Sequence, residues 1–295
     1  MTNAPDSASL ASGKGHTDEN FPVASVLIHP RHRPVILAFY RFARAADDIA
    51  DNETASADDK LRLLDNMHRS LSGPDNSAPE AVALRAALAE KNLTTQHASD
   101  LLEAFRRDVV KLRYADWDEL MDYCRYSAMP VGRFVLDVHG EDHNTWPASD
   151  ALCAALQVIN HLQDCGKDYR SLNRVYIPLD SLAAANTAPD ALGEAKSSPA
   201  LRGVIESLAR RNADLLARSK PFEGQIADTR LALEVAVIQR LAESLNRRLM
   251  ARDPLSDRVH HSKPEALGLA LLTAARFLVA RKRINKAGLQ PAAHP

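Results

Sequence analysis

The sequence is poor in glycine and cysteine and carries almost no net charge, and each shortage excludes a class of protein. Eleven glycines among 295 residues are about half of the usual share, and strand signals are almost absent. Cys124, Cys153 and Cys165 are widely separated and outside any CxxC, which excludes a disulfide framework or a zinc site and fits a reducing cytoplasm. The net charge is −1, with 37 basic against 38 acidic residues. Without a basic stripe or interleaved aromatics, nucleic acid is not an expected partner.

Long hydrophobic runs are also missing. The most apolar stretch, residues 267–280, is interrupted by Arg276 and is shorter than the roughly 20 residues that span a bilayer. We interpret it as a core helix, and a patch that contacts the membrane surface transiently is the alternative. Residues 1–18 are rich in Ser, Ala, Gly and Asp and match neither a signal peptide nor an anchor. We expect a disordered tail there and a cytoplasmic protein that is at most peripheral to the inner membrane.

The chain does have a strong helical pattern. Apolar residues make up 45% of the chain and recur with a 3.6-residue period over long segments, which predicts an all-α fold. Residues 168–199 are irregular and contain Pro178 and Pro189, so we expect a loop with short helices there. The expected organisation is a single helical domain over residues 19–285 and a tail over residues 286–295. The predicted helices cover about residues 34–51, 57–71, 79–91, 95–112, 117–138, 149–164, 200–219, 226–251 and 264–286.

Two acidic clusters lie within these apolar helical segments. Asp47 and Asp51 form one pair, and Asp164 and Asp168 form the other. Residues four apart share a helix face, where like charges repel by a few tenths of a kcal/mol in water. In a cleft with an effective dielectric near 20 the repulsion reaches about 3 kcal/mol at ~6 Å. A positive group is therefore expected beside these carboxylates.

The first cluster belongs to a longer polar stripe. Tyr40, Arg44, Asp47 and Asp51 follow one another at helical spacing, which aligns a phenol, a guanidinium and two carboxylates on one face. Apolar residues flank the stripe, and this pattern predicts a functional groove. The alternative is a surface salt bridge from Arg44 to Asp47 or Asp48, worth under about 1 kcal/mol. That alternative leaves the remaining carboxylates unpaired.

The second cluster also continues a polar stripe. Gln157, Asn160, Asp164 and Asp168 are spaced by three or four residues among apolar neighbours. The alternative is the solvated edge of an amphipathic helix. Ligands that are all oxygen favour a hard cation such as Mg²⁺ over zinc. Because Mg²⁺ usually binds one or two carboxylates together with substrate phosphate, two facing stripes predict a diphosphate bridged by metal.

The same aspartate spacing recurs elsewhere and is a weak signal alone. Asp118 and Asp122 lie among other polar residues, and Asp253 and Asp257 bracket Pro254. We interpret the first pair as a solvated helix face and the second as a turn. The neighbouring residues, rather than the spacing, therefore identify the candidate site.

Three segments in order resemble the squalene and phytoene synthase family: residues 40–51, 123–132 and 163–176. The resemblance covers most of residues 19–285. Residues 19–25 and 108–140 are similar to the bacterial subgroup that forms hydroxysqualene in hopanoid biosynthesis. The resemblance implies an isoprenoid synthase helical bundle with a central cavity, in which aspartates from facing helices hold Mg²⁺ and diphosphate.

The resemblance also implies roles for individual residues. The metal ligands would be Asp47, Asp51, Asp164 and Asp168, assisted by Asp48. Arg44 and Tyr123 would act in the chemistry. The residues expected to contact substrate are Asn20, Tyr40, Arg44, Gln157 and Asn160.

The implied reaction converts presqualene diphosphate and water into hydroxysqualene and diphosphate. Some relatives carry basic residues where this chain has Gln163 and, near its start, Glu19 and Asn20, so fewer cations would surround the diphosphate. Two alternatives stay open within or near the family. The chain could form presqualene diphosphate, squalene or phytoene, or it could be a non-catalytic helical binding protein of the same fold.

Overall fold

The computed structural model describes residues 28–287, with side chains to residue 281. The expected tail over residues 1–18 and the predicted substrate contact Asn20 lie outside the described residues. Within them the chain is helical, as the sequence predicts, and forms no strand beyond one isolated bridge between Arg113 and Val175. The helices are α1 (Arg33–Asp51), α2 (Ala57–Ser72), α3 (Pro79–Glu90), α4 (Gln96–Val110), α5 (Trp117–Ser127), α6 (Met129–His139), α7 (Trp146–Leu172), α8 (Leu179–Ala184), α9 (Pro199–Ser219), α10 (Phe222–Gln225), α11 (Thr229–Ala251) and α12 (Lys263–Ala287).

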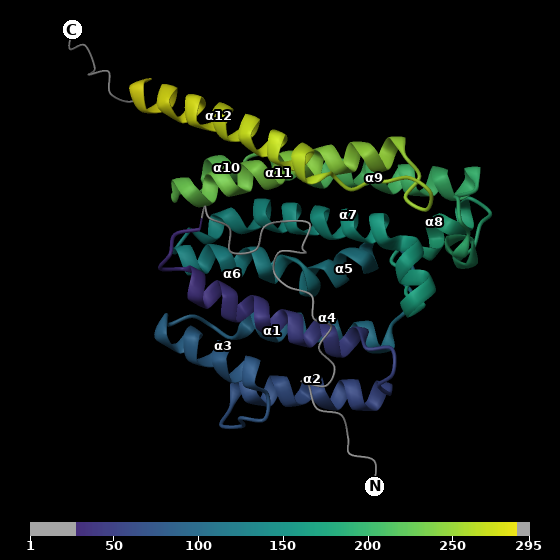
Figure 1. Cartoon of the computed structure of the whole chain (residues 1–295), viewed down its shortest axis with the longest axis horizontal. Helices are drawn as coiled ribbons and strands as arrows, with labels where there is room; N and C mark the ends of the chain where they lie inside the picture. The colour runs from purple at the N-terminus through teal and green to yellow at the C-terminus, as the bar shows by residue number, and fades with distance from the viewer. Residues whose placement is uncertain (1–27, 288–295) are drawn as a thin grey trace.

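The helices form a bundle around two adjoining apolar cores. One core joins α1, α2, α3 and α4 and includes Phe134 of α6. The other surrounds α7 and draws on α5, α9 and α11. Figure 1 shows α1 to α4 at one end of the bundle, α9, α11 and α12 at the other, and α5, α6 and α7 between them. Helices α1 and α7, which carry the two polar stripes, therefore lie on either side of the middle of the molecule.

Helix α1 begins and ends where the sequence dictates. Pro34 occupies its first turn, where a missing backbone N–H costs no hydrogen bond. The helix ends at Asp51, because the Asn52 side chain accepts hydrogen bonds from the backbone N–H groups of Thr54 and Ala55 at 3.0 and 2.8 Å. This local competition stops the helix directly after its last carboxylate. Asp51 is therefore the last residue of the helix.

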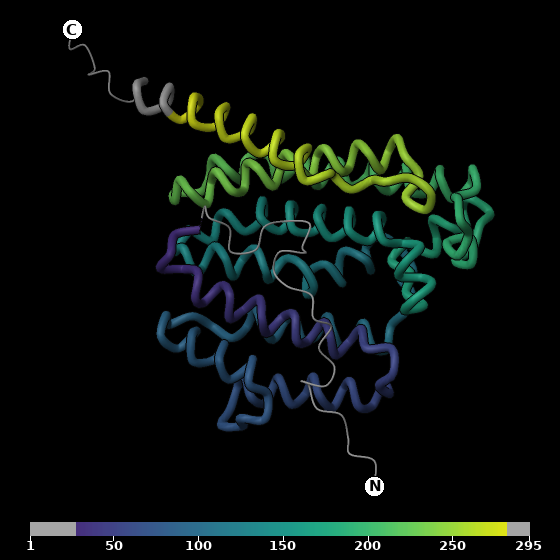
Figure 2. The backbone as a smooth tube through the Cα atoms, in the orientation of Figure 1, coloured from purple at the N-terminus to yellow at the C-terminus, as the bar shows by residue number. Residues whose placement is uncertain are grey.

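Helix α7 runs farther than the sequence pattern predicted. Its expected end was residue 164, but it continues to Leu172 and is capped by Asn173, whose φ of 51° is left-handed. Asparagine tolerates that conformation at a helix end. Asp164 and Asp168 therefore lie on one continuous helix. The trace in Figure 2 follows this long segment across the centre of the bundle.

Two other predictions need correction. The expected helix over residues 117–138 is divided at Ala128 into α5 and α6, because Pro130 supplies no N–H to continue the ladder. The interpretation of residues 267–280 as a core helix is wrong, since several apolar side chains of α12 are about half exposed or more. None of the helices within residues 28–287 is long and apolar enough to cross a membrane.

Candidate active site

An acidic cleft lies between α1 and α7, with a volume of about 270 Å³. Both polar stripes reach it, since Asp47 and Asp51 come from α1, and Gln157 and Asp168 come from α7. The remaining wall is formed by α4, α5 and the segment after α7. The other residues that line the cleft are Ala104, Phe105, Asp108, Tyr123, Ser127, His161, Leu172, Arg174 and Tyr176.

Arg44 is bound by two carboxylates of its own helix. Its guanidinium donates to Asp47 Oδ2 at 2.8 Å and lies 2.8 Å from Asp48 Oδ1. The Asp48 side chain is 10% exposed and that of Asp47 is 35% exposed. Asp47 is thus the more open of the two. The salt bridge proposed as an alternative does form, but it coexists with the groove rather than replacing it.

The carboxylates of α1 and α7 affect one another across the cleft. Burial raises the pKa of Asp47 to about 7, and repulsion from Asp51 adds to the shift. Burial likewise raises the pKa of Asp168 to about 7, and the charges of Asp164 and Asp51 contribute. Carboxylate oxygens of this kind suit a hard cation. These residues therefore fit a magnesium site shared between the two helices.

The donor set also suggests how a cation would be held. Across residues 28–287, no three His, Cys, Asp or Glu side chains gather closely enough to hold a metal by themselves. Mg²⁺ usually keeps several waters and binds one or two carboxylates together with substrate phosphates. The open arrangement of Asp51 and Asp168 fits that mode better than a closed protein cage.

A buried hydrogen-bond network closes the floor of the cleft. The Tyr123 hydroxyl donates to Asp108 Oδ2 at 2.7 Å, and the Tyr176 hydroxyl donates to Asp108 Oδ1 at 2.8 Å. Burial raises the pKa of Asp108 to about 6, while the positive charge of Arg174 opposes that shift. Tyr123, predicted to act in the chemistry, is thus fixed by a residue that the sequence reasoning missed.

Arg174 ties this network to the end of α1. It donates from Nη1 to Asp51, from Nη2 to the carbonyl oxygen of Ala50 at 3.0 Å, and from Nε to the carbonyl oxygen of Asp108 at 3.1 Å. Its side chain is 8% exposed. A buried guanidinium in three hydrogen bonds is a rigid cation. It supplies one of the positive groups that the sequence predicted beside the carboxylates.

The residues missed from the sequence are Asp108, His161, Arg174 and Tyr176. One signal was available for Asp108, because it continues the buried spacing of Leu101 and Ala104 on α4. A carboxylate on an apolar helix face needs a partner. His161 also had a signal, because it follows Gln157 by four residues and precedes Asp168 by seven on α7. Arg174 and Tyr176 come after the end of α7, and only the tertiary structure brings them to the cleft.

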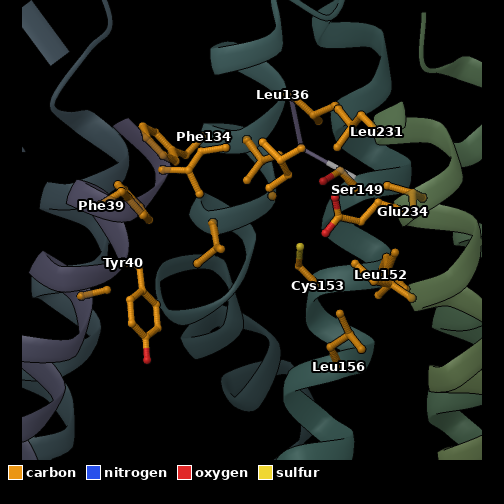
Figure 3. A pocket seen from close by; sticks show the side chains of 18 of the residues that line it. Phe39, Tyr40, Phe134, Leu136, Ser149, Leu152, Cys153, Leu156, Leu231 and Glu234 are labelled. Atoms are coloured by element: carbon orange, nitrogen blue, oxygen red, sulfur yellow. The ribbon is translucent and has the colours of Figure 1, made fainter. Parts of the chain in front are cut away.

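An apolar cavity of about 430 Å³ adjoins the acidic cleft. The two share Asp47 and Phe105 in their walls. In Figure 3, Phe39 and Tyr40 of α1 face side chains of α7 and α11 across this cavity. Its other polar contributors include Arg44, Ser149, Cys153 and Glu234. A chain that is polar at one end and apolar along its length would fit the two spaces together.

The structure brings five of the predicted site residues together in the walls of the acidic cleft: Asp47, Asp51, Tyr123, Gln157 and Asp168. Tyr40, Arg44 and Asp47 line the apolar cavity, and their stripe leads from it into the acidic cleft. Asp48, Asn160 and Asp164 are not among the residues that line either space. Asn160 and Asp164 precede Asp168 on α7 by eight and four residues. One last group lies outside the described residues. It contains Asn20 alone.

The two weaker aspartate pairs lie away from the cleft and behave as predicted. The Asp118 side chain is 94% exposed, as a solvated helix face requires. Asp253 accepts hydrogen bonds from the backbone N–H groups of Ser197 and Leu255 at 2.8 and 3.0 Å. It therefore organises a turn. Asp47 and Asp51 lie opposite the polar stripe of α7, and neither of the weaker pairs lies opposite such a stripe.

The comparison with protein families agrees with this geometry. Residues 14–265 match the family model described as squalene/phytoene synthase. The chain belongs to this family. It is 59% identical over 275 residues to the hydroxysqualene synthase of Zymomonas mobilis, covering 92% of this chain and 93% of that one. It is 56% identical to the hydroxysqualene synthase of Rhodopseudomonas palustris, covering 100% and 99% of the two chains.

Solved structures of the squalene/phytoene synthase family share the fold. A squalene synthase from Alicyclobacillus acidocaldarius is 30% identical, with a TM-score of 0.68 over 83% of this chain and 90% of that one. A dehydrosqualene synthase in complex with a ligand is 22% identical, with a TM-score of 0.73 over 89% and 93% of the two chains. The isoprenoid synthase helical fold expected from the resemblance is therefore confirmed.

Proposed function

We propose that this chain is a hydroxysqualene synthase that converts presqualene diphosphate and water into hydroxysqualene and diphosphate. The observation that carries the proposal is the continuity between the acidic cleft and the apolar cavity through Asp47 and Phe105. The near full-length similarity to hydroxysqualene synthases of two bacteria supports it. The cytoplasm is the proposed location.

The diphosphate would bind in the cleft and the two prenyl tails in the apolar cavity. Tails of this kind gain about 25 cal/mol for each Å² of apolar surface removed from water. Arg44, Arg174 and the amide of Gln157 are the neutralising and donor groups near the diphosphate. Tyr40 lines the cavity close to Arg44, and Asn160 lies one turn after Gln157 on α7. These residues would orient the headgroup.

Mg²⁺ would be held by Asp47, Asp51, Asp164 and Asp168, and when bound it neutralises the charge that develops on the departing diphosphate. Arg44 would serve the same end, because its guanidinium is already held by Asp47 and Asp48 and would need no reorganisation. Cleavage of the carbon–oxygen bond leaves a cyclopropylcarbinyl cation. Its rearranged form accepts a water oxygen and loses one proton, which gives hydroxysqualene.

Tyr123 is placed to act on the carbocation side of the reaction. Its ring packs against those of Tyr114 and Tyr176, with ring centroids 5.3 and 5.4 Å away. The negative faces of aromatic rings attract a cation that passes close to them. The hydroxyl of Tyr123 is committed to Asp108, so we propose that the ring stabilises positive charge while the hydroxyl fixes its orientation.

Product analysis tests the proposal directly. The purified protein is incubated with presqualene diphosphate and Mg²⁺, with and without NADPH, and the products are identified by mass spectrometry. We expect hydroxysqualene in both incubations and an oxygen that derives from labelled water. No turnover of presqualene diphosphate would overturn the proposed reaction, and squalene formed only with NADPH would favour the squalene-forming alternative.

Matched substitutions distinguish an enzyme from a binding protein of the same fold. Asp47→Asn and Asp164→Asn should each abolish Mg²⁺-dependent turnover. Asp118→Asn and Asp122→Asn change an aspartate pair of equal spacing outside the cleft and should leave turnover unchanged. If the first two variants kept their activity, the assignment of the metal site would be wrong.

A further inference from the structure

Helix α12 presents an uncovered apolar face. Its partly buried side chains, such as Phe277, pack against the core that surrounds α7. Exposed large apolar side chains lie at both ends of residues 267–279, and the turn between them carries two alanines. In Figure 1, α12 runs along α11 and then extends beyond the body of the bundle. The exposed fractions are 59% for Leu267, 62% for Leu271, 48% for Leu272, 49% for Leu278 and 53% for Val279.

After Glu265, the charged residues of this segment are all basic. Glu265 is the acidic residue of α12, and its carboxylate lies 3.1 Å from Arg248 of α11. No Asp or Glu follows Glu265 in the sequence, whereas Arg276 is followed by the basic cluster Arg281, Lys282, Arg283 and Lys286. A helix with an apolar face and basic residues suits the boundary of an anionic bilayer.

Helix α12 packs against the helix that forms one wall of the apolar cavity. Leu231, Val235 and Ile238 of α11 line the apolar cavity, and α12 packs along α11. Arg281 donates to the carbonyl oxygen of Ala227 at 3.3 Å, just before α11 begins. The C-terminal half of α12 therefore lies close to the α11 wall of the cavity.

We propose that α12 docks this chain on an anionic lipid surface. Leu271, Leu278 and their neighbours enter the boundary between headgroups and acyl chains, and the basic residues meet lipid phosphates. The proposal draws on the proposed function in one respect, since a long-chain isoprenoid substrate and product would pass between the bilayer and the cavity. A second copy of the chain is a poorer partner for this face, because it would bring its own basic segment to the interface.

Co-sedimentation with vesicles tests the proposal without any turnover. The full chain is mixed with phosphatidylcholine vesicles that contain or lack phosphatidylglycerol, at about 0.05 M and about 0.5 M salt. We expect binding to the anionic vesicles that weakens at high salt, where charges are screened within a few ångströms. No binding to anionic vesicles would overturn the proposal, and it would leave the proposed reaction untouched.

Substitutions test whether α12 is the surface that binds the vesicles. Leu271→Ser with Leu278→Ser should lower the partition coefficient about tenfold or more, because buried CH₂ groups drive insertion. Val110→Ser removes an apolar side chain that is 64% exposed on α4 and should change nothing. Equal binding of the double variant would overturn the assignment to α12. A dimer in solution that the double variant dissociates would overturn the lipid proposal in favour of self-association.

Discussion

The Tyr123 hydroxyl donates a 2.7 Å hydrogen bond to a carboxylate oxygen of Asp108, and both side chains are buried. The second carboxylate oxygen is taken by Tyr176 at 2.8 Å. One carboxylate on α4 therefore orients two phenols that line the acidic cleft. The backbone carbonyl of the same residue accepts a hydrogen bond from Arg174. We therefore expect Asp108 to act as a positioning residue, through the two phenols that it orients.

Asp108→Asn should preserve the fold and lower catalysis. The amide has nearly the same shape, and it can accept from one phenol and donate to the other, but it loses the charge that faces Arg174. Outer residues of this kind typically change activity on the order of 10- to 100-fold when replaced. We expect kcat to fall in that range with a smaller change in KM, measured by steady-state kinetics. Wild-type kcat in this variant would contradict the positioning role.

Asp108→Ala provides the contrast in stability. It leaves two buried hydroxyl groups without their acceptor, and each such group costs about 1–3 kcal/mol. The melting temperature should therefore fall for the alanine variant and stay near the wild-type value for the asparagine variant. If both variants unfold at the same lower temperature, Asp108 serves stability alone.

The sequence was sufficient to predict the helical class and the two polar stripes, because both depend on periodicity within single helices. It predicted α1 to within one residue at its start, since Pro34 and Asn52 fix the ends locally. It could not predict Arg174 beside Asp51. That contact joins residues far apart in the chain, and no spacing rule relates them. The exposure of α12 was missed for the same reason, since periodicity does not show whether an apolar helix face is covered.

Gly132 lets α6 approach α7 where both line the apolar cavity. A Cβ added there would lie 2.4 Å from Ser149 Oγ and 2.6 Å from Cys153 Sγ, so both side chains would have to move to admit it. Gly132→Ala should destabilise the protein by about 1–3 kcal/mol, the usual cost of overpacking. Urea denaturation measures this. Gly203→Ala, at a helical position with open space around the added carbon, should leave stability unchanged or raise it slightly.

Asp168→Asn should separate repulsion from metal binding. Near pH 7.5 the carboxyl is largely ionised above its folded pKa of about 7, so neutralising it relieves repulsion and should raise the melting temperature without metal. Mg²⁺ with diphosphate should stabilise the wild type by about 3 kcal/mol at a hundredfold excess over Kd. Mg²⁺ with diphosphate should stabilise the Asp168→Asn variant much less. Equal stabilisation of both proteins in a thermal-shift titration would remove Asp168 from the metal site.

His161 should make the protein less stable in mild acid. Its ring stacks on Tyr176 with centroids 3.6 Å apart, and burial lowers its pKa to about 3, with Arg174 adding to the shift. Between the ordinary value of 6.5 and that lower value, the unfolded chain binds a proton that the folded chain does not. Stability therefore falls as pH drops below 6.5, by about 1.4 kcal/mol per pH unit.

Replacing His161 with Phe keeps an aromatic ring against Tyr176 and removes this titration. The carboxyls and the remaining histidines titrate in both proteins, so their effects largely cancel in the difference between the two unfolding free energies. Measured by urea denaturation, the variant should gain about 2 kcal/mol relative to the wild type between pH 7 and pH 5. Parallel stability curves over that range would mean that His161 takes up its proton in the folded protein. In that case the imidazolium would be a further cation within the cleft, beside Arg174 and close to the proposed diphosphate.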